Sequence, residues 1–138
     1  MTVNADVLLQ VPLFQGMTDR ALEALAAMAT EVAFEQGATL TREGDEGDAF
    51  YLLLEGRTSV SRGNRVVREM GANEFFGEIS LIDGRPRTAT ITALTPIRAV
   101  EIRRPGFQEL LDRFAAVRLS LLMALAERIR ADERDSPG

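Results

Sequence analysis

The sequence predicts an α+β protein that is mainly β: an antiparallel β-barrel or jelly roll of about eight strands, with helices at both ends of the chain. Three observations support this fold class. Eight of the 11 glycines fall between Gly37 and Gly84, and turn residues at this density separate short strands. From Glu31 to Arg104, short apolar or alternating runs stand between these turns. The segments on either side show helical periodicity instead.

The N-terminal part predicts one helix that covers an end of the core. Residues 1–12 fit a loose lead-in, a short helix or a docking segment equally well. A helix is expected next, capped by Thr18 and carrying Asp19 in its first turn. Its apolar face is formed by Leu22, Leu25, Met28 and Ala29. We interpret residues 13–134 as a single domain and residues 135–138 as a disordered tail.

The central part predicts the strands of the barrel. A two-residue turn at Gly63 and Asn64 lies between SVSR and RVVR and predicts a hairpin. The apolar run from Tyr51 to Leu54 is expected to be buried on both faces or to bridge two sheets. Strands are placed near Glu31–Phe34, Thr39–Arg42, Ala49–Glu55, Thr58–Arg62, Val66–Met70, Thr88–Leu94 and Ile97–Arg103.

Two helices are predicted after Pro105 and Gly106, over 107–114 and 117–132. Apolar residues of the second recur at helical spacing, which is typical of core packing. They are Leu119, Leu122, Met123, Ala126 and Ile129. A long helix at the end of a barrel can also form a lid over a pocket, dimerise, or do both. We expect Arg128 and Arg130 to be solvated, with contact to a ligand as the less favoured alternative.

The stretch FFGEISLIDGRPRTATITA, from Phe75 to Ala93, has the features of a phosphate site. Gly77 allows close approach of the backbone. A short helical turn is expected over 78–82, where free N–H groups attract an anion. The fork of donors on Arg87 matches two phosphate oxygens, and the carboxylate of Glu78 suits a ribose hydroxyl.

A purely structural interpretation of the same stretch stays open. Glu78 fits as a first-turn carboxylate favoured by the helix dipole, and Arg87 as its ion-pair partner that ties the loop down. Arg85 competes for the phosphate role, but it precedes Pro86 and is expected to lie on a turn facing solvent.

Within this stretch, FGEISLIDGRPRTAT resembles the phosphate-binding cassette of cyclic nucleotide-binding domains. Upstream, REGDEGDAFYLLLEGRTSV resembles the paired strands and turns that precede the cassette, and the resemblance extends over roughly residues 10–132. It implies that Arg87 pairs with the cyclic phosphate and that Glu78 binds the ribose 2′-hydroxyl. It further implies contacts from Gly77, from the backbone of Ile79 and Ser80, and from Thr88 to phosphate.

The implied function is that of a regulatory sensor. The resemblance indicates a cyclic purine mononucleotide, cyclic AMP or cyclic GMP, as the ligand, with binding relayed through the terminal helices. Thr88 leaves the choice between the two nucleotides undecided. The implied protein is a separate sensor domain without a DNA-binding or kinase module, and its C-terminal helix is a candidate for homodimer formation.

Composition excludes several other functions. The chain has no cysteine and no histidine, which rules out disulfides, thiol nucleophiles, imidazole catalysis and most transition-metal sites. We expect no metal and no cofactor, and interpret the acidic cluster Asp45–Asp48 as a solvated turn. A net charge of −5 argues against direct binding to nucleic acid. No apolar stretch approaches the length of a membrane span, so a cytoplasmic protein is expected.

Three alternatives remain beside the sensor. The domain can be a ligand-free protein-interaction module with a vestigial pocket, or a sensor fragment of a larger regulator. A carboxylate-based hydrolase is chemically open, although we expect no enzyme activity because no histidine is present for proton transfer.

Overall fold

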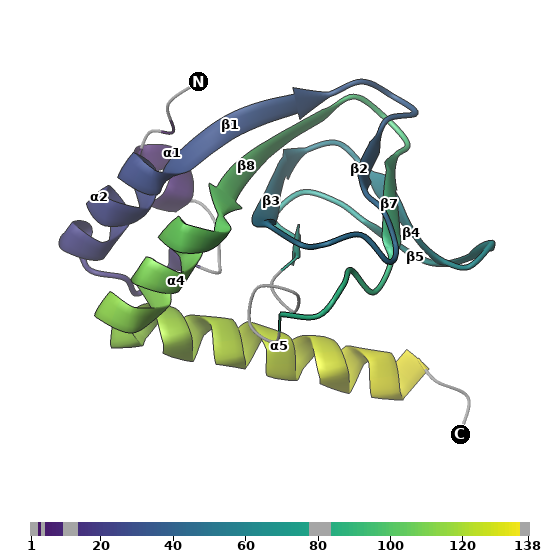
Figure 1. Ribbon diagram of the computed structural model, residues 1–138. Helices are drawn as coiled ribbons and strands as arrows, with labels where there is room; N and C mark the ends of the chain where they lie inside the picture. Colours follow the sequence, from purple (N-terminus) through teal and green to yellow (C-terminus); the bar gives the residue numbers. More distant parts are fainter. Residues whose placement is uncertain (1–2, 4, 10–13, 78–83, 136–138) are drawn as a thin grey trace.

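The computed structural model describes residues 3, 5–9, 14–77 and 84–135. It confirms the mainly β fold with helices at both ends of the chain (Figure 1). Eight strands in the described part form two four-stranded sheets whose paired strands are antiparallel. The first sheet has the order β1 (Ala29–Phe34), β8 (Ile97–Arg103), β3 (Ala49–Glu55) and β6 (Phe75–Phe76). The second has the order β2 (Thr39–Thr41), β7 (Thr90–Ala93), β4 (Thr58–Arg62) and β5 (Arg65–Met70).

Strand β3 contributes to two hydrophobic cores. Phe50 and Leu52 point into a core shared with the helices, whereas Tyr51 and Leu53 point into the core between the sheets. Successive side chains of a strand face opposite sides, so a continuous apolar run is what burial on both faces requires. The prediction that the run starting at Tyr51 is buried on both faces is confirmed for these residues.

The predicted hairpin connects β4 and β5. Arg62 pairs with Arg65 across the turn, and Gly63 has a φ of 61°, a left-handed conformation that glycine adopts without strain. The register of the pair shifts at Val60, which pairs with Arg68 while Ser61 pairs with Val66. Val67 is therefore an extra residue in β5, and such a bulge changes the direction of the side chains beside it.

The described part contains four helices, three of them at one end of the sheets and the last starting at that end and running alongside the sheets (Figure 1). They are α1 (Ala5–Leu9), α2 (Asp19–Met28), α4 (Arg104–Arg113) and α5 (Ala115–Asp135). The predicted cap of α2 is confirmed, since Thr18 Oγ1 accepts a hydrogen bond from the Ala21 amide at 3.1 Å. None of the described helices combines the length and the apolar character that crossing a membrane would require.

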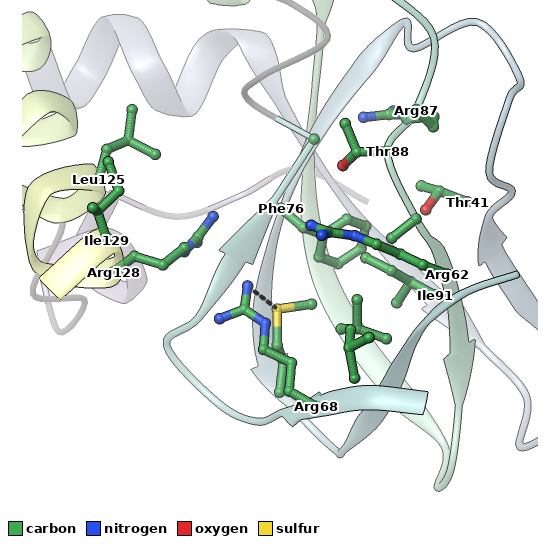
Figure 2. Close-up of a pocket in the computed structure, with 15 residues that line it drawn as sticks. Thr41, Arg62, Arg68, Phe76, Arg87, Thr88, Ile91, Leu125, Arg128 and Ile129 are labelled. Carbon is green, nitrogen blue, oxygen red and sulfur yellow. Dashed lines mark hydrogen bonds between the residues drawn. The ribbon is translucent and has the colours of Figure 1, made fainter. Parts of the chain in front are cut away.

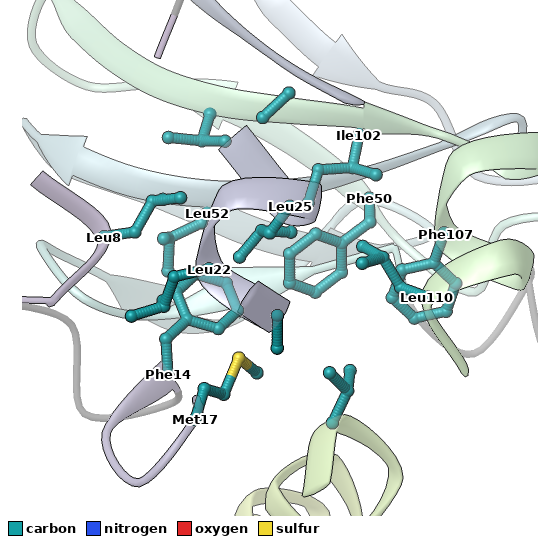
Figure 3. Close-up of a cluster of buried hydrophobic side chains, with 14 of the residues drawn as sticks. Leu8, Phe14, Met17, Leu22, Leu25, Phe50, Leu52, Ile102, Phe107 and Leu110 are labelled. Carbon is teal, nitrogen blue, oxygen red and sulfur yellow. The ribbon is translucent and has the colours of Figure 1, made fainter. Parts of the chain in front are cut away.

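The core on the helical side is built around Phe50 (Figure 3). Its ring stacks on Phe107 of α4 at 5.3 Å and lies 5.6 Å from the ring of Phe75. Leu22 and Leu25 of α2 are buried in the same core, as their helical spacing predicts. Leu8 of α1 is fully buried there too, so part of the N-terminal segment packs against the body of the protein.

Of the alternatives for the apolar stripe of α5, core packing is wrong because the stripe is exposed, whereas a lid and a dimer helix stay open. The exposed fractions of Leu119, Leu122, Met123 and Ile129 lie between 59% and 64%, and Ala126 is also exposed. The buried face carries Val117 and Leu121. The helix has apolar residues on two sides, and periodicity alone does not distinguish the side that packs from the side that faces solvent.

Other differences from the predicted elements are small. The expected strand from Thr88 is shorter and starts at Thr90, and α4 starts at Arg104 with Pro105 in its first turn. Strand β6 is not predicted by any periodic pattern. The predicted helical turn over 78–82 lies outside the described residues, as do 136–138 of the predicted tail.

Candidate functional site

The site is a cavity of about 550 Å³ between the second sheet and α5 (Figure 2). Strands β4, β5 and β7 supply an apolar wall that includes Val60, Met70 and Ile91. Leu125 and Ile129 of α5 lie across from this wall. Small-molecule sites in proteins typically have volumes of about 300–1,000 Å³ and combine apolar walls with a few polar groups.

Arg87 places a guanidinium at one end of the cavity, and only 8% of the residue is exposed. Its amide donates to the Asp45 carbonyl at 2.8 Å, and its carbonyl accepts from the Gly44 amide at 3.0 Å. Its Nη2 donates to the Ala49 carbonyl at 2.7 Å. Backbone and side chain are thus both held in place. Because burial lowers the effective dielectric constant, a charge here interacts strongly with an anion in the cavity.

Gly77 lets this guanidinium lie against the backbone. Its φ is +95°, and a Cβ atom at this position would lie 2.5 Å from Arg87 Nη1 and 2.6 Å from the Ala49 carbonyl oxygen. Both the conformation and the space therefore favour glycine. The predicted close approach at Gly77 is confirmed, and the groups that approach are the guanidinium and a main-chain carbonyl of the protein itself.

The structure places some of the other predicted site residues. Thr88 is exposed and lines the cavity next to Arg87 (Figure 2). Arg85 is exposed and is not among the described residues that line the cavity. Glu78, Ile79 and Ser80 lie outside the described residues, and the same holds for the alternative ion pair of Arg87 with Glu78.

Tyr51 supports the cavity from the core between the sheets. Its ring stacks on Phe76 at 5.2 Å, and its hydroxyl donates to Glu101 at 2.9 Å. Burial, followed by the hydrogen bond to Glu101 and the charge of that residue, raises the pKa of Tyr51 well above the usual value for tyrosine. The hydroxyl therefore stays protonated at physiological pH, and Tyr51 contributes no negative charge beside Arg87.

The expectation that Arg128 is solvated is wrong. Arg128 of α5 is half-buried and lines the cavity. Its Nη2 donates to the Phe75 carbonyl at 2.7 Å, and its Cζ lies 4.4 Å from the centre of the Phe75 ring. The helical spacing from the buried Leu121 to Leu125 and then to Arg128 could have indicated this face. Arg130 is exposed.

Arg62 of β4 and Arg68 of β5 line the cavity and were not predicted as site residues (Figure 2). A partial signal exists for Arg62, since it lies two residues after Val60 and so on the same face of β4. The same signal exists for Arg68, which lies two residues before buried Met70, whereas the bulge at Val67 brings that valine to the cavity as well.

Comparison with known proteins finds one family model that matches, the cyclic nucleotide-binding domain, over residues 31–114. The chain is 32% identical over 130 residues to a CRP-like cAMP-activated global transcriptional regulator of Mycobacterium tuberculosis, covering 91% of this chain and 58% of the relative. It is 36% identical over 131 residues to a cAMP-dependent protein kinase regulatory subunit of Eremothecium gossypii, covering 94% of this chain and 27% of that subunit. The chain therefore spans 58% and 27% of the length of these two relatives.

A solved structure is also similar to this chain in fold and in sequence. The N-terminal domain of a transcriptional regulator from Streptomyces coelicolor has a TM-score of 0.72 and 36% identity to this chain. The match covers 96% of this chain and 99% of that domain.

Proposed function

The chain belongs to the cyclic nucleotide-binding domain family, and from this membership we propose that it is a regulatory sensor that binds a cyclic purine mononucleotide, cyclic AMP or cyclic GMP. The relatives named above carry cyclic AMP in their names and regulate transcription or a kinase. The family is regulatory and not catalytic, in keeping with a site that carries no histidine or cysteine.

The observation that carries the proposal is the buried guanidinium of Arg87 at the end of a cavity of about 550 Å³. A cyclic phosphate has one negative charge and two exocyclic oxygens, which suit the paired donors of a guanidinium. In the proposed complex Arg87 and Thr88 bind the phosphate together with the backbone of Gly77, Ile79 and Ser80.

The other contacts in the proposed complex are made to the ribose and to the base of the nucleotide. Glu78 accepts a hydrogen bond from the ribose 2′-hydroxyl, since an ionised carboxylate is an acceptor only. The base lies between the sheet wall and α5, where Leu125 and Ile129 face it.

We propose that α5 relays binding. Arg128 ties this helix to Phe75, which directly precedes the cassette, and Leu125 lies over the cavity. A ligand that contacts α5 favours the arrangement in which those contacts are made, to the extent that it binds that arrangement more tightly than the open one.

The decisive experiment is a ligand titration of the purified chain, with thermal unfolding as the measurement. Cyclic AMP or cyclic GMP at about 100 times its dissociation constant should add about 2.7 kcal/mol to stability, whereas the linear 5′-monophosphates should give a much smaller shift. A chain whose unfolding is unchanged by millimolar cyclic nucleotides would instead be the interaction module with a vestigial pocket. Conversion of the cyclic nucleotide to a linear monophosphate would indicate the hydrolase.

The exposed face of α5 favours a second copy of the chain as a partner. Leu119, Leu122 and Ala126 follow one another at spacings of three and four residues, the pattern of the a and d positions of a coiled coil. A seam with this pattern is self-complementary, as a twofold dimer requires. We therefore propose that two copies pair through this face.

Replacing Leu122 with glutamate should dissociate the dimer, because two charges would then meet in the apolar seam. Sedimentation equilibrium should give twice the mass of one chain for the unaltered protein and the mass of one chain for Leu122→Glu. Val66→Glu, which charges an equally exposed position on β5, is the control and should remain dimeric. An unaltered protein that sediments as a monomer would contradict the pairing.

A further inference from the structure

The hairpin of β4 and β5 is a positively charged element of a negatively charged protein. Residues 57–70 contain four arginines and one glutamate, which gives this segment a net charge of +3. The other 12 basic and 20 acidic residues give the rest of the chain a net charge of −8. The hairpin projects beyond the other strands on the side away from α1 and α2 (Figure 1). An anionic partner is therefore attracted to this part of the protein and repelled by the rest.

Two arginines are paired next to the turn of this hairpin. Arg62 and Arg65 lie opposite each other in the register of β4 and β5, and both are exposed. Like charges at directly opposite positions destabilise a pair of strands. No salt bridge among the described residues involves either arginine, although the carboxylate of Glu43 accepts a hydrogen bond from the Gly63 amide at 2.8 Å. A carboxylate from another molecule would offset the repulsion between the two guanidinium groups.

Strand β5 is the last strand of the second sheet. Among the described strands it pairs only with β4, so its other edge carries N–H and C=O groups that no strand of the sheet engages. An edge of this kind can bind an extended polypeptide segment as an additional strand, with main-chain hydrogen bonds that supply much of the affinity.

The same strand exposes two adjacent valines. Val66 and Val67 have exposed fractions of 62% and 46%. Val66 pairs with Ser61, the neighbour of buried Val60, and therefore lies on the face turned away from the core, whereas Val67 is the bulge residue at the cavity. Charged residues on an edge strand commonly prevent pairing with other chains, but exposed β-branched residues favour it. The combination suits an added strand that carries both apolar side chains and carboxylates.

Other occupants fit this edge less well. A second copy of the chain would bring a second set of arginines to the same edge, and like charges on adjacent strands repel. Nucleic acid is attracted by arginine, but the net charge of −8 on the rest of the chain repels it, and it cannot provide the main-chain pairing of a strand.

We propose that the free edge of β5 binds an extended acidic segment of a partner protein, which adds to the second sheet as a further strand. The main chain of the segment pairs with β5, and its apolar side chains contact Val66 and Val67. Its carboxylates lie beside Arg62 and Arg65. This surface is separate from the exposed face of α5, and the inference goes beyond the proposed sensor function.

Titration of the isotope-labelled chain with a designed peptide tests the docking, with NMR as the measurement. The probe is a capped ten-residue peptide in which glutamate and valine alternate. Its addition should shift the amide resonances of Arg65–Met70, whereas a peptide of alternating lysine and valine should leave them in place. The glutamate–valine peptide with N-methyl groups at every second residue should bind more weakly when the methylated edge is the one that pairs, because it lacks the donors for the ladder.

Charge-swapped variants assign the binding to this edge. The double variant Arg62→Glu and Arg65→Glu should lose the glutamate–valine peptide and gain the lysine–valine peptide. Val66→Glu should weaken binding of the glutamate–valine peptide about 5-fold or more, because a repulsive cross-strand contact replaces an attractive one. Arg20→Glu with Arg113→Glu is the matched control, since it changes two exposed arginines of α2 and α4 and should leave the affinity unchanged. Circular dichroism checks that each variant is folded.

Several outcomes would overturn the inference. A chain that does not bind the glutamate–valine peptide would do so, as would a charge-swapped variant that still prefers it. Tighter binding of a single-stranded oligonucleotide at the same amides would assign the arginines to nucleic acid instead. These outcomes leave the sensor function intact, because Val66 does not line the cavity and Val66→Glu should keep the thermal shift with cyclic nucleotide.

Discussion

Replacing Arg87 with alanine should abolish micromolar binding of the cyclic nucleotide. Truncating one partner of a buried, charge-assisted pair costs about 2–5 kcal/mol, which corresponds to roughly 30-fold to several thousand-fold in affinity. An exposed ion pair would cost only about 0–1 kcal/mol, and Arg87 is 8% exposed. Calorimetry with the variant and the unaltered chain measures the loss.

Two further variants test whether the loss of binding is specific to the guanidinium of Arg87. Arg87→Lys keeps the charge but presents no fork to the phosphate or to the Ala49 carbonyl, so it should recover only part of the affinity. Arg85→Ala removes an exposed arginine two residues away, outside the described lining of the cavity, and should bind as the unaltered chain does. Unchanged affinity in a folded Arg87→Ala variant would refute the phosphate assignment.

Replacing Gly77 with alanine should reduce both stability and binding. A side chain at a φ of +95° is strained by about 1–2 kcal/mol, and the contacts of its Cβ at 2.5 Å and 2.6 Å add about 1–3 kcal/mol of overpacking. The guanidinium of Arg87 has to move to relieve the contact, so its donors leave the position that suits the phosphate. Urea unfolding gives the first effect and calorimetry the second.

Gly37→Ala is the matched control for Gly77→Ala. Gly37 has nearly the same φ, +90°, and no atom within 4 Å of the added Cβ, so only the conformational strain applies. The difference in stability between the two variants therefore measures the steric contribution at Gly77. Equal losses of stability in both variants, with ligand affinity retained in Gly77→Ala, would contradict the role assigned to Gly77.

Much of the barrel could be predicted because its strands follow local rules. The strands Ala49–Glu55, Thr58–Arg62 and Ile97–Arg103 have the bounds that turns and apolar runs indicate. Strand β6 could not be predicted in this way, since Phe75 and Phe76 form a strand only through their pairing with Tyr51 and Leu52, which are distant in sequence.

The candidate site could be predicted only in part. The spacing of Gly77 and Arg87 predicts that they belong to one site, and the structure brings them into contact. The place of Val67 at the cavity depends on the bulge in β5, which no local pattern indicates. The placement of Arg128 depends on which side of α5 packs against the sheets, and this is decided by tertiary contacts and not by helical period.

The two-sided burial of β3 has a consequence for the integrity of the domain. Removing the terminal helices would leave Phe50 and Leu52 in water, and removing the second sheet would do the same to Tyr51 and Leu53. A shift of one residue in the pairing of β3 would move each pair of side chains into the other core. Both cores therefore require the same register of β3. Neither half can therefore persist as a separate unit, and the chain should melt as a single cooperative block.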